Sequence, residues 1–503
     1  SQMITTAIDR RRALSLAGVA WLGSGPVAVA QNASPRLPPS DTKPEDEPHR
    51  LPADVTTHHA IDLPGRTLHF DATAGSIRLT GADLAFVAYQ LSGAERAHRP
   101  VTFAFNGGPG FASAWLNVGA VGPWRIPLSG EVAGPSSSPE PMPNAETWLD
   151  FTDLVFIDPA GTGYSRVLAR DHDARRRLWS VAGDIEYLAE AVRRWLDRFD
   201  RDVSPKYLLG ESYGGFRVPR LARELATSQG TGVSGMVMVS PALDFGGRSS
   251  AFDPISYATR LPTMTAAARA ARGPVTRAGL ADVERYAVTD FLRDAIRGER
   301  DADAIARRSA RVAEFTGLDP ALVRRYHGLL SNDVFLHELD RARGRLGSIY
   351  DATVTTADPF PLDAMGDYPD PVLEALKAPV SSAMVEIYQN RLNWRPDSDY
   401  RLGNAEVNHQ WDWGRGIWNS PQSMDAMRTA LALDPRVSVL IMHGLFDLIT
   451  PYFGTQLLLD QLPESDIAAR IRLSVLQGGH MLYTDDTSRA ALRDEAAALF
   501  GRR

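Results

Sequence analysis

Short apolar runs recur along the chain and are separated by polar, glycine-rich or amphipathic segments. Continuous apolar runs of this length are typical of strands buried on both faces, as in a parallel sheet. Between two of these runs, the segment Asp184–Phe199 repeats its apolar side chains with the period of a helix. Alternating strands and helices indicate an α/β fold in which helices cover both faces of a mostly parallel sheet. The predicted strands are Val101–Phe105, Leu154–Asp158, Lys206–Gly210, Gly235–Ser240, Val437–His443 and Ile471–Leu476.

The pattern differs in two regions. At residues 67–81, "TLHFDATAGSIRLTG" alternates polar and apolar residues around a predicted turn, and "DLAFVAYQL" follows as a further strand of an antiparallel start. Residues 250–430 hold Ala- and Arg-rich helical stretches and then a Pro-, Trp- and Asn-rich segment. We expect this insertion to form a largely helical cap over the carboxyl ends of the strands, where α/β folds bind ligands. The core is then divided into residues 59–249 and 431–503.

Residues 1–30 resemble a secretory signal peptide, with Arg10–Arg12 ahead of an apolar stretch that ends in Ala28–Ala30. The arginine pair also suits a twin-arginine signal. The alternative is an amphipathic first helix of the domain. Because glycine and proline interrupt the stretch, it is a poor membrane-spanning helix, and we expect no stable membrane anchor. We expect an exported protein, periplasmic or secreted, in which residues 31–58 form a disordered leader or linker.

Composition excludes several classes of function. The chain has 503 residues, of which 44% are hydrophobic, so it can bury one large core or two modest ones. Its formal net charge of −7 argues against a nucleic-acid partner. It contains no cysteine, which excludes disulfides, a thiolate nucleophile and thiolate metal ligands.

The segment "LLGESYGGF" at residues 208–216 places Ser212 in a G-x-S-x-G pattern. A predicted strand precedes it and the helix-like "FRVPRLARELA" follows, which is the strand–turn–helix context of a nucleophile elbow. The sharp turn of such an elbow leaves little room for side chains two positions either side of the serine, where this chain has Gly210 and Gly214. The alternative is a glycine-rich turn with a surface serine. We predict that Ser212 is a catalytic nucleophile.

A serine hydroxyl is a poor nucleophile unless a base takes its proton and an acid orients that base. Asp447 follows the strand-like run "VLIMH", and His480 follows a glycine pair after the next run. In folds with this elbow the acid precedes the histidine along the chain. Asp158, His443 and Asp244 also lie near predicted strand ends and are the alternatives. We predict that His480 is the base and Asp447 the acid that orients it.

The segment Asn106–Gly110, "NGGPG", also follows a predicted strand. A glycine-rich loop after an early strand supplies an oxyanion donor in folds of this type. A loop of this composition could instead hold a phosphate, but no P-loop lysine follows and the spacing is not G-x-G-x-x-G. We therefore interpret the segment as an oxyanion-binding loop.

Five motifs in this order, "NGGPG", "IDPAGTGYS", "GESYGGFRVPRLA", "GLFDLITP" and "GGHM", resemble those of the serine carboxypeptidases. The resemblance runs from about residue 60 to the C-terminus, except for the insertion. It implies an α/β-hydrolase fold and a serine-type carboxypeptidase that cleaves peptides with a triad of Ser212, Asp447 and His480. It implies neither a metal nor a cofactor.

The resemblance also implies how a peptide substrate binds. The oxyanion hole would be formed by the N–H groups of Gly108 and Tyr213, and Met481 would line the pocket for the leaving residue. A glutamate can bind a carboxylate only when it is protonated, because two carboxylates in contact cannot both ionise. A preference for acid pH is therefore expected. The residues implied to bind the C-terminal carboxylate of the substrate are Asn106, Gly107 and Glu211.

The chain also departs from the family pattern. Ala120 occupies the position of a second glutamate that shares a proton with the first in the eukaryotic members, and Phe111 replaces a cysteine. Asp-Gln-Pro of the second motif reads Ile157–Pro159 here. These changes fit an exported bacterial branch, and they leave the pH optimum open.

Two other functions remain as alternatives. An esterase or acyltransferase of the same fold would use the same triad on a different acyl group. A catalytically silent binding protein is the third hypothesis, and it predicts the loss of at least one triad residue, whereas all three are present.

Overall fold

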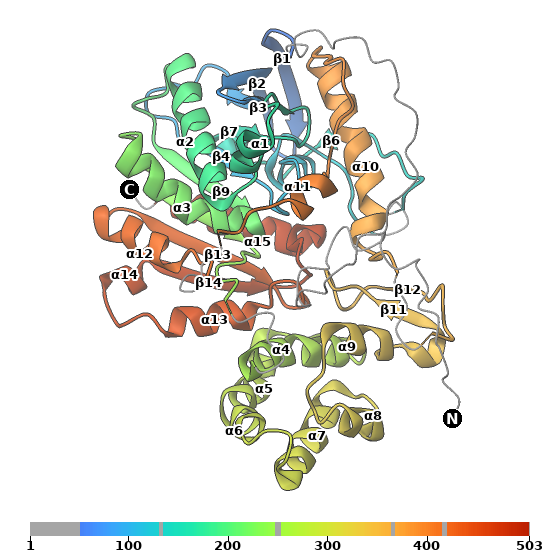
Figure 1. Cartoon of the computed structure of the whole chain (residues 1–503). Coiled ribbons are helices and arrows are strands. Elements are labelled where there is room, and N and C mark those ends of the chain that lie inside the picture. The colour runs from blue at the N-terminus through green and yellow to red at the C-terminus, as the bar shows by residue number, and fades with distance from the viewer. Residues whose placement is uncertain (1–50, 130–133, 247–252, 364–367, 415–419, 502–503) are drawn as a thin grey trace.

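The computed structural model describes residues 51–129, 134–246, 253–363, 368–414 and 420–501, whose elements are labelled in Figure 1. The predicted signal peptide and most of the predicted leader lie outside these residues. A ten-stranded sheet forms the centre of the molecule, and two short two-stranded sheets lie outside it. The strands are β1 Val55–Leu63, β2 Arg66–Leu79, β3 Ala82–Leu91, β4 Val101–Phe105, β5 Trp124–Arg125, β6 Met142–Pro143, β7 Asp153–Ile157, β8 Arg166–Val167, β9 Lys206–Glu211, β10 Gly235–Val239, β11 Arg345–Gly347, β12 Thr355–Ala357, β13 Ser438–Gly444 and β14 Ile471–Leu476.

The central sheet is mostly parallel. Its order is β1-β2-β3-β7-β4-β9-β10-β13-β14, with β8 paired to β3. The strands from β7 to β14 along this order pair in parallel, whereas β1, β2 and β3 are antiparallel. Every strand predicted from an apolar run belongs to the parallel part. With β9 turning directly into a helix, this is the α/β-hydrolase fold.

The N-terminal strands differ from the prediction in two respects. β2 continues without a break from Arg66 to Leu79, so the turn lies at the end of "TLHFDATAGSIRLTG", at Gly81 before β3, and not inside its alternating part. A Cβ at Gly75 would lie 2.2 Å from Asp54 Oδ1, so this glycine allows a close approach of the preceding segment. β1 begins at Val55, inside the range predicted to be a disordered leader, because residues 55–63 pair with β2 along their whole length.

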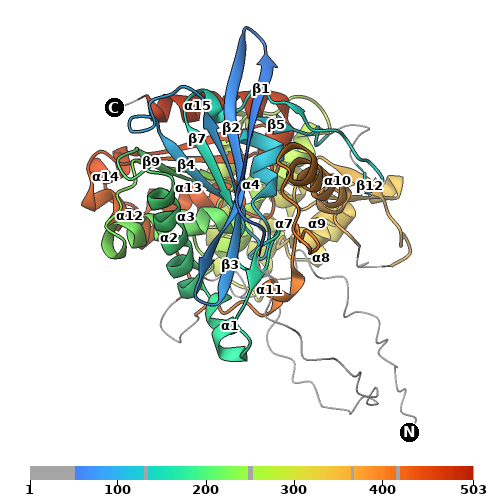
Figure 2. The same cartoon turned by 90° about the horizontal axis from the view of Figure 1, so that it is seen from above.

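Helices cover both faces of the sheet. The α-helices are α1 His172–Leu178, α2 Val181–Arg198, α3 Tyr213–Ser228, α4 Pro254–Ala270, α5 Ala281–Tyr286, α6 Leu292–Ile296, α7 Ala302–Thr316, α8 Pro320–Arg325, α9 Asn332–Glu338, α10 Leu373–Glu386, α11 Ala405–His409, α12 Met424–Leu433, α13 Tyr452–Asp460, α14 Asp466–Ala469 and α15 Asp486–Phe500. Helices α2, α3 and α12 pack together on one face, and α15 packs on β10 and β13 (Figure 2). Phe103 and Leu208 enter the core on the α2–α3 side, whereas their neighbours Ala104 and Leu209 enter the other core. Burial on both faces therefore explains the continuous apolar runs.

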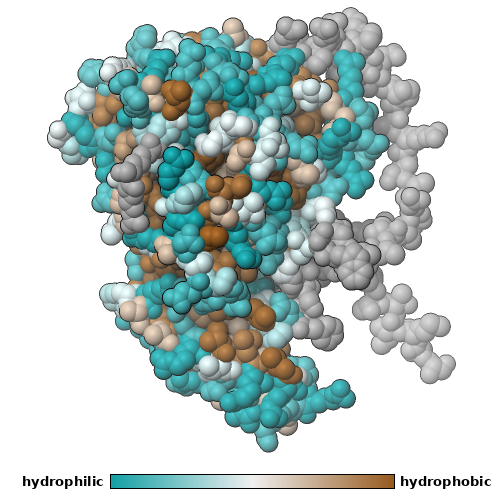
Figure 3. Space-filling model, turned by 90° about the vertical axis from the view of Figure 1, so that its left-hand side faces the viewer, coloured by the Kyte–Doolittle hydropathy of each residue, from teal (hydrophilic) through white to brown (hydrophobic). Residues whose placement is uncertain are grey.

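The insertion has two parts in space. Helices α4 to α9 form a lobe below the sheet in Figure 1, and α10 returns alongside the α/β core. Figure 3 shows this lobe projecting from the core, with hydrophilic and hydrophobic residues interspersed on the visible face. Helix α12 packs on α3, so the core resumes at Met424, before residue 430. None of the described helices is both long enough and apolar enough to cross a membrane.

Candidate active site

Ser212 lies in the sharp turn between β9 and α3. Its backbone has φ 60° and ψ −121°, a conformation that L-residues rarely adopt. The turn is held by its N–H, which donates to the carbonyl oxygen of Val239 at 3.0 Å. A Cβ at Gly210 would lie 2.2 Å from the carbonyl oxygen of Gly214, and one at Gly214 would lie 2.2 Å from that of Phe105. The two glycines therefore allow three segments to meet closely around the serine.

His480 and Asp447 come together from the ends of two neighbouring strands. His480 follows β14 and Asp447 follows β13, and Nδ1 of the imidazole lies 2.8 Å from Oδ2 of the carboxylate. The N–H groups of Ile449 and Thr450 donate to Oδ1 of Asp447 at 2.8 and 3.0 Å. Burial opposes ionisation of Asp447, but the charge and hydrogen bond of His480 hold its pKa below the usual value. The partnership in turn raises the pKa of His480, although burial opposes this.

The backbone of His480 is fixed from two sides. Its N–H donates to the carbonyl oxygen of Tyr350 at 2.6 Å, and its carbonyl oxygen accepts from the hydroxyl of Ser240 at 2.7 Å. A Cβ at Gly479 would lie 2.0 Å from the same Tyr350 oxygen. The glycine before the histidine is therefore required for this close approach.

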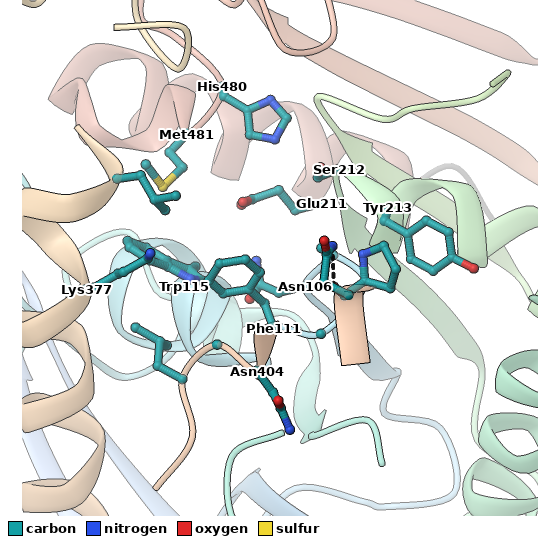
Figure 4. A pocket seen from close by; sticks show the side chains of 18 of the residues that line it. Asn106, Phe111, Trp115, Glu211, Ser212, Tyr213, Lys377, Asn404, His480 and Met481 are labelled. Carbon is teal, nitrogen blue, oxygen red and sulfur yellow. Dashed lines mark hydrogen bonds between the residues drawn. The ribbon is translucent and has the colours of Figure 1, made fainter. Parts of the chain in front are cut away.

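One cavity of about 720 Å³ brings the serine and the histidine together. Ser212 and His480 both line it, as do the glycine loop, Glu211 and Met481 (Figure 4). The described residues include no hydrogen bond between the Ser212 hydroxyl and the imidazole. Such nucleophile–base contacts are often long without substrate and tighten when it binds. Asp447 lies behind the histidine and does not line the cavity.

The glycine loop after β4 presses against the start of α3. A Cβ at Gly107 would lie 2.6 Å from the backbone nitrogen of Tyr213, and Gly108 has φ 110°. Tyr213 is the first residue of α3, so its N–H has no partner inside the helix. The N–H groups of Gly108 and Tyr213 therefore belong to two segments in contact beside Ser212.

A buried ion pair, which was not predicted from the sequence, holds the backbone of the glycine loop at Asn106. Arg217 of α3 contacts Asp184 of α2 through Nε at 2.7 Å and Nη2 at 3.2 Å, and both side chains are fully buried. Nη1 of Arg217 also donates to the carbonyl oxygen of Asn106. Arg217 falls one turn after Tyr213 and one turn before Leu221 on the apolar stripe of α3, and this placement is the sequence signal that could have revealed it.

Glu211, the residue before the nucleophile, is 4% exposed. Burial raises the pKa of its carboxyl to about 7, although His480, Tyr483 and Asn106 each lower it in part. Oε2 of Glu211, the amide nitrogen of Asn106 and the hydroxyl of Tyr483 are all buried and have no hydrogen bond of regular geometry to a described residue. The Asn106 amide is oriented by its oxygen, which accepts from the Leu116 N–H at 3.0 Å. A protonated carboxyl and an amide nitrogen can both donate to an anionic oxygen.

Tyr483 is a second residue that sequence reasoning missed. It lies in the short helix η8 (Leu482–Thr484), and its ring packs so closely on the helix η1 (Trp115–Val121) that a Cβ at Gly119 would lie 2.9 Å from it. Ala120, the next residue of η1, is buried and has no polar side chain to offer Glu211. The polar neighbour of Glu211 on this side is therefore the tyrosine hydroxyl.

The alternative acids and bases do not line the cavity. Asp158 is buried, its Oδ1 accepts from the Ser113 N–H at 2.8 Å, and burial raises its pKa to about 7. His443 is paired with the hydroxyl of Thr455 at 2.9 Å. Asp244 accepts from a backbone N–H two residues later in its own turn. These side chains have structural partners in the described part of the chain.

Comparison with known proteins finds similarity over part of the chain. Residues 64–249 match the model of the serine carboxypeptidase family. Serine carboxypeptidase-like 28 of Arabidopsis thaliana is 28% identical over 200 residues, which cover 37% of this chain and 40% of that protein. A pheromone-processing carboxypeptidase of Schizosaccharomyces pombe is 27% identical over 180 residues, covering 35% of this chain and 32% of that protein. Residues 64–249 thus resemble the serine carboxypeptidase family, and segments of the chain are similar to individual serine carboxypeptidases at distant identity.

The matched segments thus span less than half the length of these curated relatives. Among solved structures, proline iminopeptidase of Mycobacterium smegmatis superposes with a TM-score of 0.36 and 14% identity, over 85% of this chain and 97% of that one.

Proposed function

We propose that the protein is a serine-type carboxypeptidase that hydrolyses the C-terminal peptide bond of peptides through an acyl-enzyme. The observation that carries the proposal is the buried Glu211 carboxyl beside Ser212, in one cavity with His480. Binding an internal segment of a peptide does not require a carboxyl with a pKa of about 7 next to the nucleophile, because such a segment has no free carboxylate at the cleaved bond. Binding a free carboxylate does require such a group, because a neutral carboxyl can donate a hydrogen bond to the carboxylate.

In the proposed acylation step, Nε2 of His480 takes the hydroxyl proton of Ser212 as Oγ attacks the last peptide carbonyl. The Asp447 carboxylate accepts from Nδ1–H, so Nε2 is left free to act as the base. Negative charge develops on the carbonyl oxygen, and the N–H groups of Gly108 and Tyr213 are the proposed donors to it. One such donor typically contributes about 3–4 kcal/mol in the transition state.

The C–N bond then breaks, and the imidazolium of His480 gives its proton to the leaving amino acid. Water enters, loses a proton to the same imidazole, and attacks the acyl-enzyme, which releases the shortened peptide and restores the Ser212 hydroxyl. Apart from the water molecule, the proposed steps use side chains and backbone N–H groups of this chain.

We propose that the α-carboxylate of the substrate binds to Glu211, the Asn106 amide and the Gly107 N–H. Arg217 strengthens this set, because its hydrogen bond to the carbonyl of Asn106 polarises the peptide unit that carries the Gly107 N–H. Met481, which lines the cavity, then contacts the side chain of the leaving residue.

Blocked dipeptides with a free or an amidated C-terminus test the proposal. We expect release of the C-terminal amino acid from the free acid, and at least tenfold lower kcat/KM on the amide, since a hydrogen bond to a charged group contributes about 1.5–3 kcal/mol. Ser212→Ala, with a fluorophosphonate probe as a label of the nucleophile, is the control. Equal turnover of both peptides, or efficient cleavage of simple esters only, would refute carboxypeptidase activity in favour of an esterase or acyltransferase.

We further propose that the protein is exported, on the signal-like pattern of residues 1–30. The N-terminal sequence of the protein recovered from its native host would check this. Cleavage after Ala30 is the expected result, and an intact N-terminus on the cytoplasmic protein would contradict it.

A further inference from the structure

The cavity has an uneven distribution of charge. Among the described residues that line it, Glu211 is the one acid, whereas Lys377, Arg401 and His480 are basic. Because burial raises the pKa of Glu211 to about 7, its carboxyl is neutral below that pH. His480 is balanced by the Asp447 carboxylate. The remaining charge in the cavity is therefore positive, which favours a substrate with an additional negative charge.

Lys377 supplies this positive charge at a defined place. It belongs to α10 of the insertion, and α10 packs against η1. In Figure 4, its side chain extends from the helix towards Trp115, on the side of the cavity where Met481 lies, and the Glu211 carboxyl points to the same side. Ser381, one helical turn after Lys377, also lines the cavity and adds a hydroxyl donor.

We propose that Lys377 selects an acidic leaving residue, its ammonium group binding the side-chain carboxylate of a C-terminal aspartate or glutamate. This inference rests on the proposed carboxypeptidase activity. The α-carboxylate of the same residue goes to Asn106 and Glu211, so the two carboxylates of one amino acid have separate partners on one side of the cavity.

Lys377 already has a partner in the structure, but one that a substrate can replace. Its Nζ lies 2.5 Å from Oε1 of Glu374, three residues earlier on α10, and the two side chains are 31% and 40% exposed. Exposed pairs at this spacing are weak, because water solvates both partners. Glu374 does not line the cavity. A carboxylate inside the cavity therefore competes with it under less screening by solvent.

The test is a set of blocked dipeptides that differ only in the C-terminal residue: Asp, Asn or Ala. Asn matches Asp in size and lacks its charge, so the ratio of kcat/KM for Asp over Asn isolates the side-chain carboxylate. Below pH 7 we expect this ratio to be roughly tenfold in the wild type, which is the usual size of the contribution of a charge-assisted hydrogen bond. We expect the difference to lie in KM.

Two variants sharpen the test. Lys377→Met should lower the ratio to about one, and Lys377→Arg should keep it, since the charge remains. Glu374→Gln is the matched control on the same helix: it removes the competing carboxylate and should increase the ratio. A ratio that Lys377→Met leaves unchanged overturns the inference.

Three further outcomes are distinguishable. If the wild-type enzyme releases Ala and Asn but does not prefer Asp, the inference is overturned and the proposed activity stands. If Lys377→Met lowers kcat/KM equally for the peptides that end in Asp, Asn and Ala, the ammonium group of Lys377 binds the α-carboxylate. This result also overturns the selection of an acidic side chain. If no peptide with a free C-terminus is cleaved although Ser212 reacts with a fluorophosphonate, both proposals fail.

Discussion

Glu211→Gln would test the role of the buried carboxyl by removing its titration while keeping a side chain of the same size. Burial raises the pKa of Glu211 to about 7. Below that pH its carboxyl can donate to a substrate carboxylate, and above it two carboxylates would repel each other. We expect the KM of the wild type for a free-acid peptide to rise above pH 7. Losing a hydrogen bond to a charged group costs about 1.5–3 kcal/mol, so the increase should be roughly tenfold to a hundredfold. The glutamine never ionises and its amide still donates, so the KM of the variant should stay nearly constant.

The same substitution should change how stability depends on pH. The native pKa of Glu211 is raised from 4.5 to about 7, so the native state holds this proton more tightly than the unfolded chain does. The resulting stabilisation is fully present below pH 4.5 and is lost as the pH rises through 7. At 1.36 kcal/mol per pKa unit it amounts to about 3 kcal/mol. Asp158, whose pKa burial also raises to about 7, contributes equally in both proteins. Urea unfolding across this window should therefore show a loss of stability that is about 3 kcal/mol smaller in Glu211→Gln than in the wild type.

Peptide amides and esters provide the control for the KM measurement, because they lack the α-carboxylate. Their KM should not follow the titration of Glu211 in either protein. The reasoning is refuted if Glu211→Gln and the wild type have the same pH dependence of KM on free-acid peptides. It is also refuted if the amides show the same rise as the acids.

Three other substitutions test the support of the site. Asp447→Asn should lower kcat by about 10⁴-fold through the wrong tautomer of His480, while circular dichroism stays unchanged; a loss under tenfold would contradict the triad. Arg217→Met leaves a buried aspartate without its partner and should cost about 3–5 kcal/mol in urea unfolding, and a change below about 1 kcal/mol would contradict this. Tyr483→Phe removes a hydroxyl that lowers the pKa of Glu211, so the midpoint of the rise of KM with pH on free-acid peptides should move to higher pH. An unchanged midpoint would exclude a contact between Tyr483 and Glu211.

The parallel strands and the nucleophile turn could be predicted from the sequence because both depend on local rules. A strand buried on both faces has to be apolar throughout, so β4, β9 and β10 are visible as runs of apolar residues. Gly210 and Gly214 are required by backbone contacts within a few residues of Ser212, which leaves a recognisable pattern. The alternating segment at residues 67–81 contains two glycines, and the sequence did not distinguish Gly81, where the chain turns, from Gly75, which allows a close approach of Asp54.

By itself, therefore, the sequence determined the fold class, the elbow and the order of the candidate catalytic residues. Only the tertiary structure decided that His480 and Asp447 lie 2.8 Å apart. It also decided that Arg217 supports Asn106 from behind and that Tyr483 is the polar neighbour of Glu211. These pairs join segments far apart in the chain, and their energies come from burial that no single segment has alone. Local sequence patterns record the shape that a segment needs, whereas the pKa of a carboxyl depends on everything that surrounds it in the folded protein.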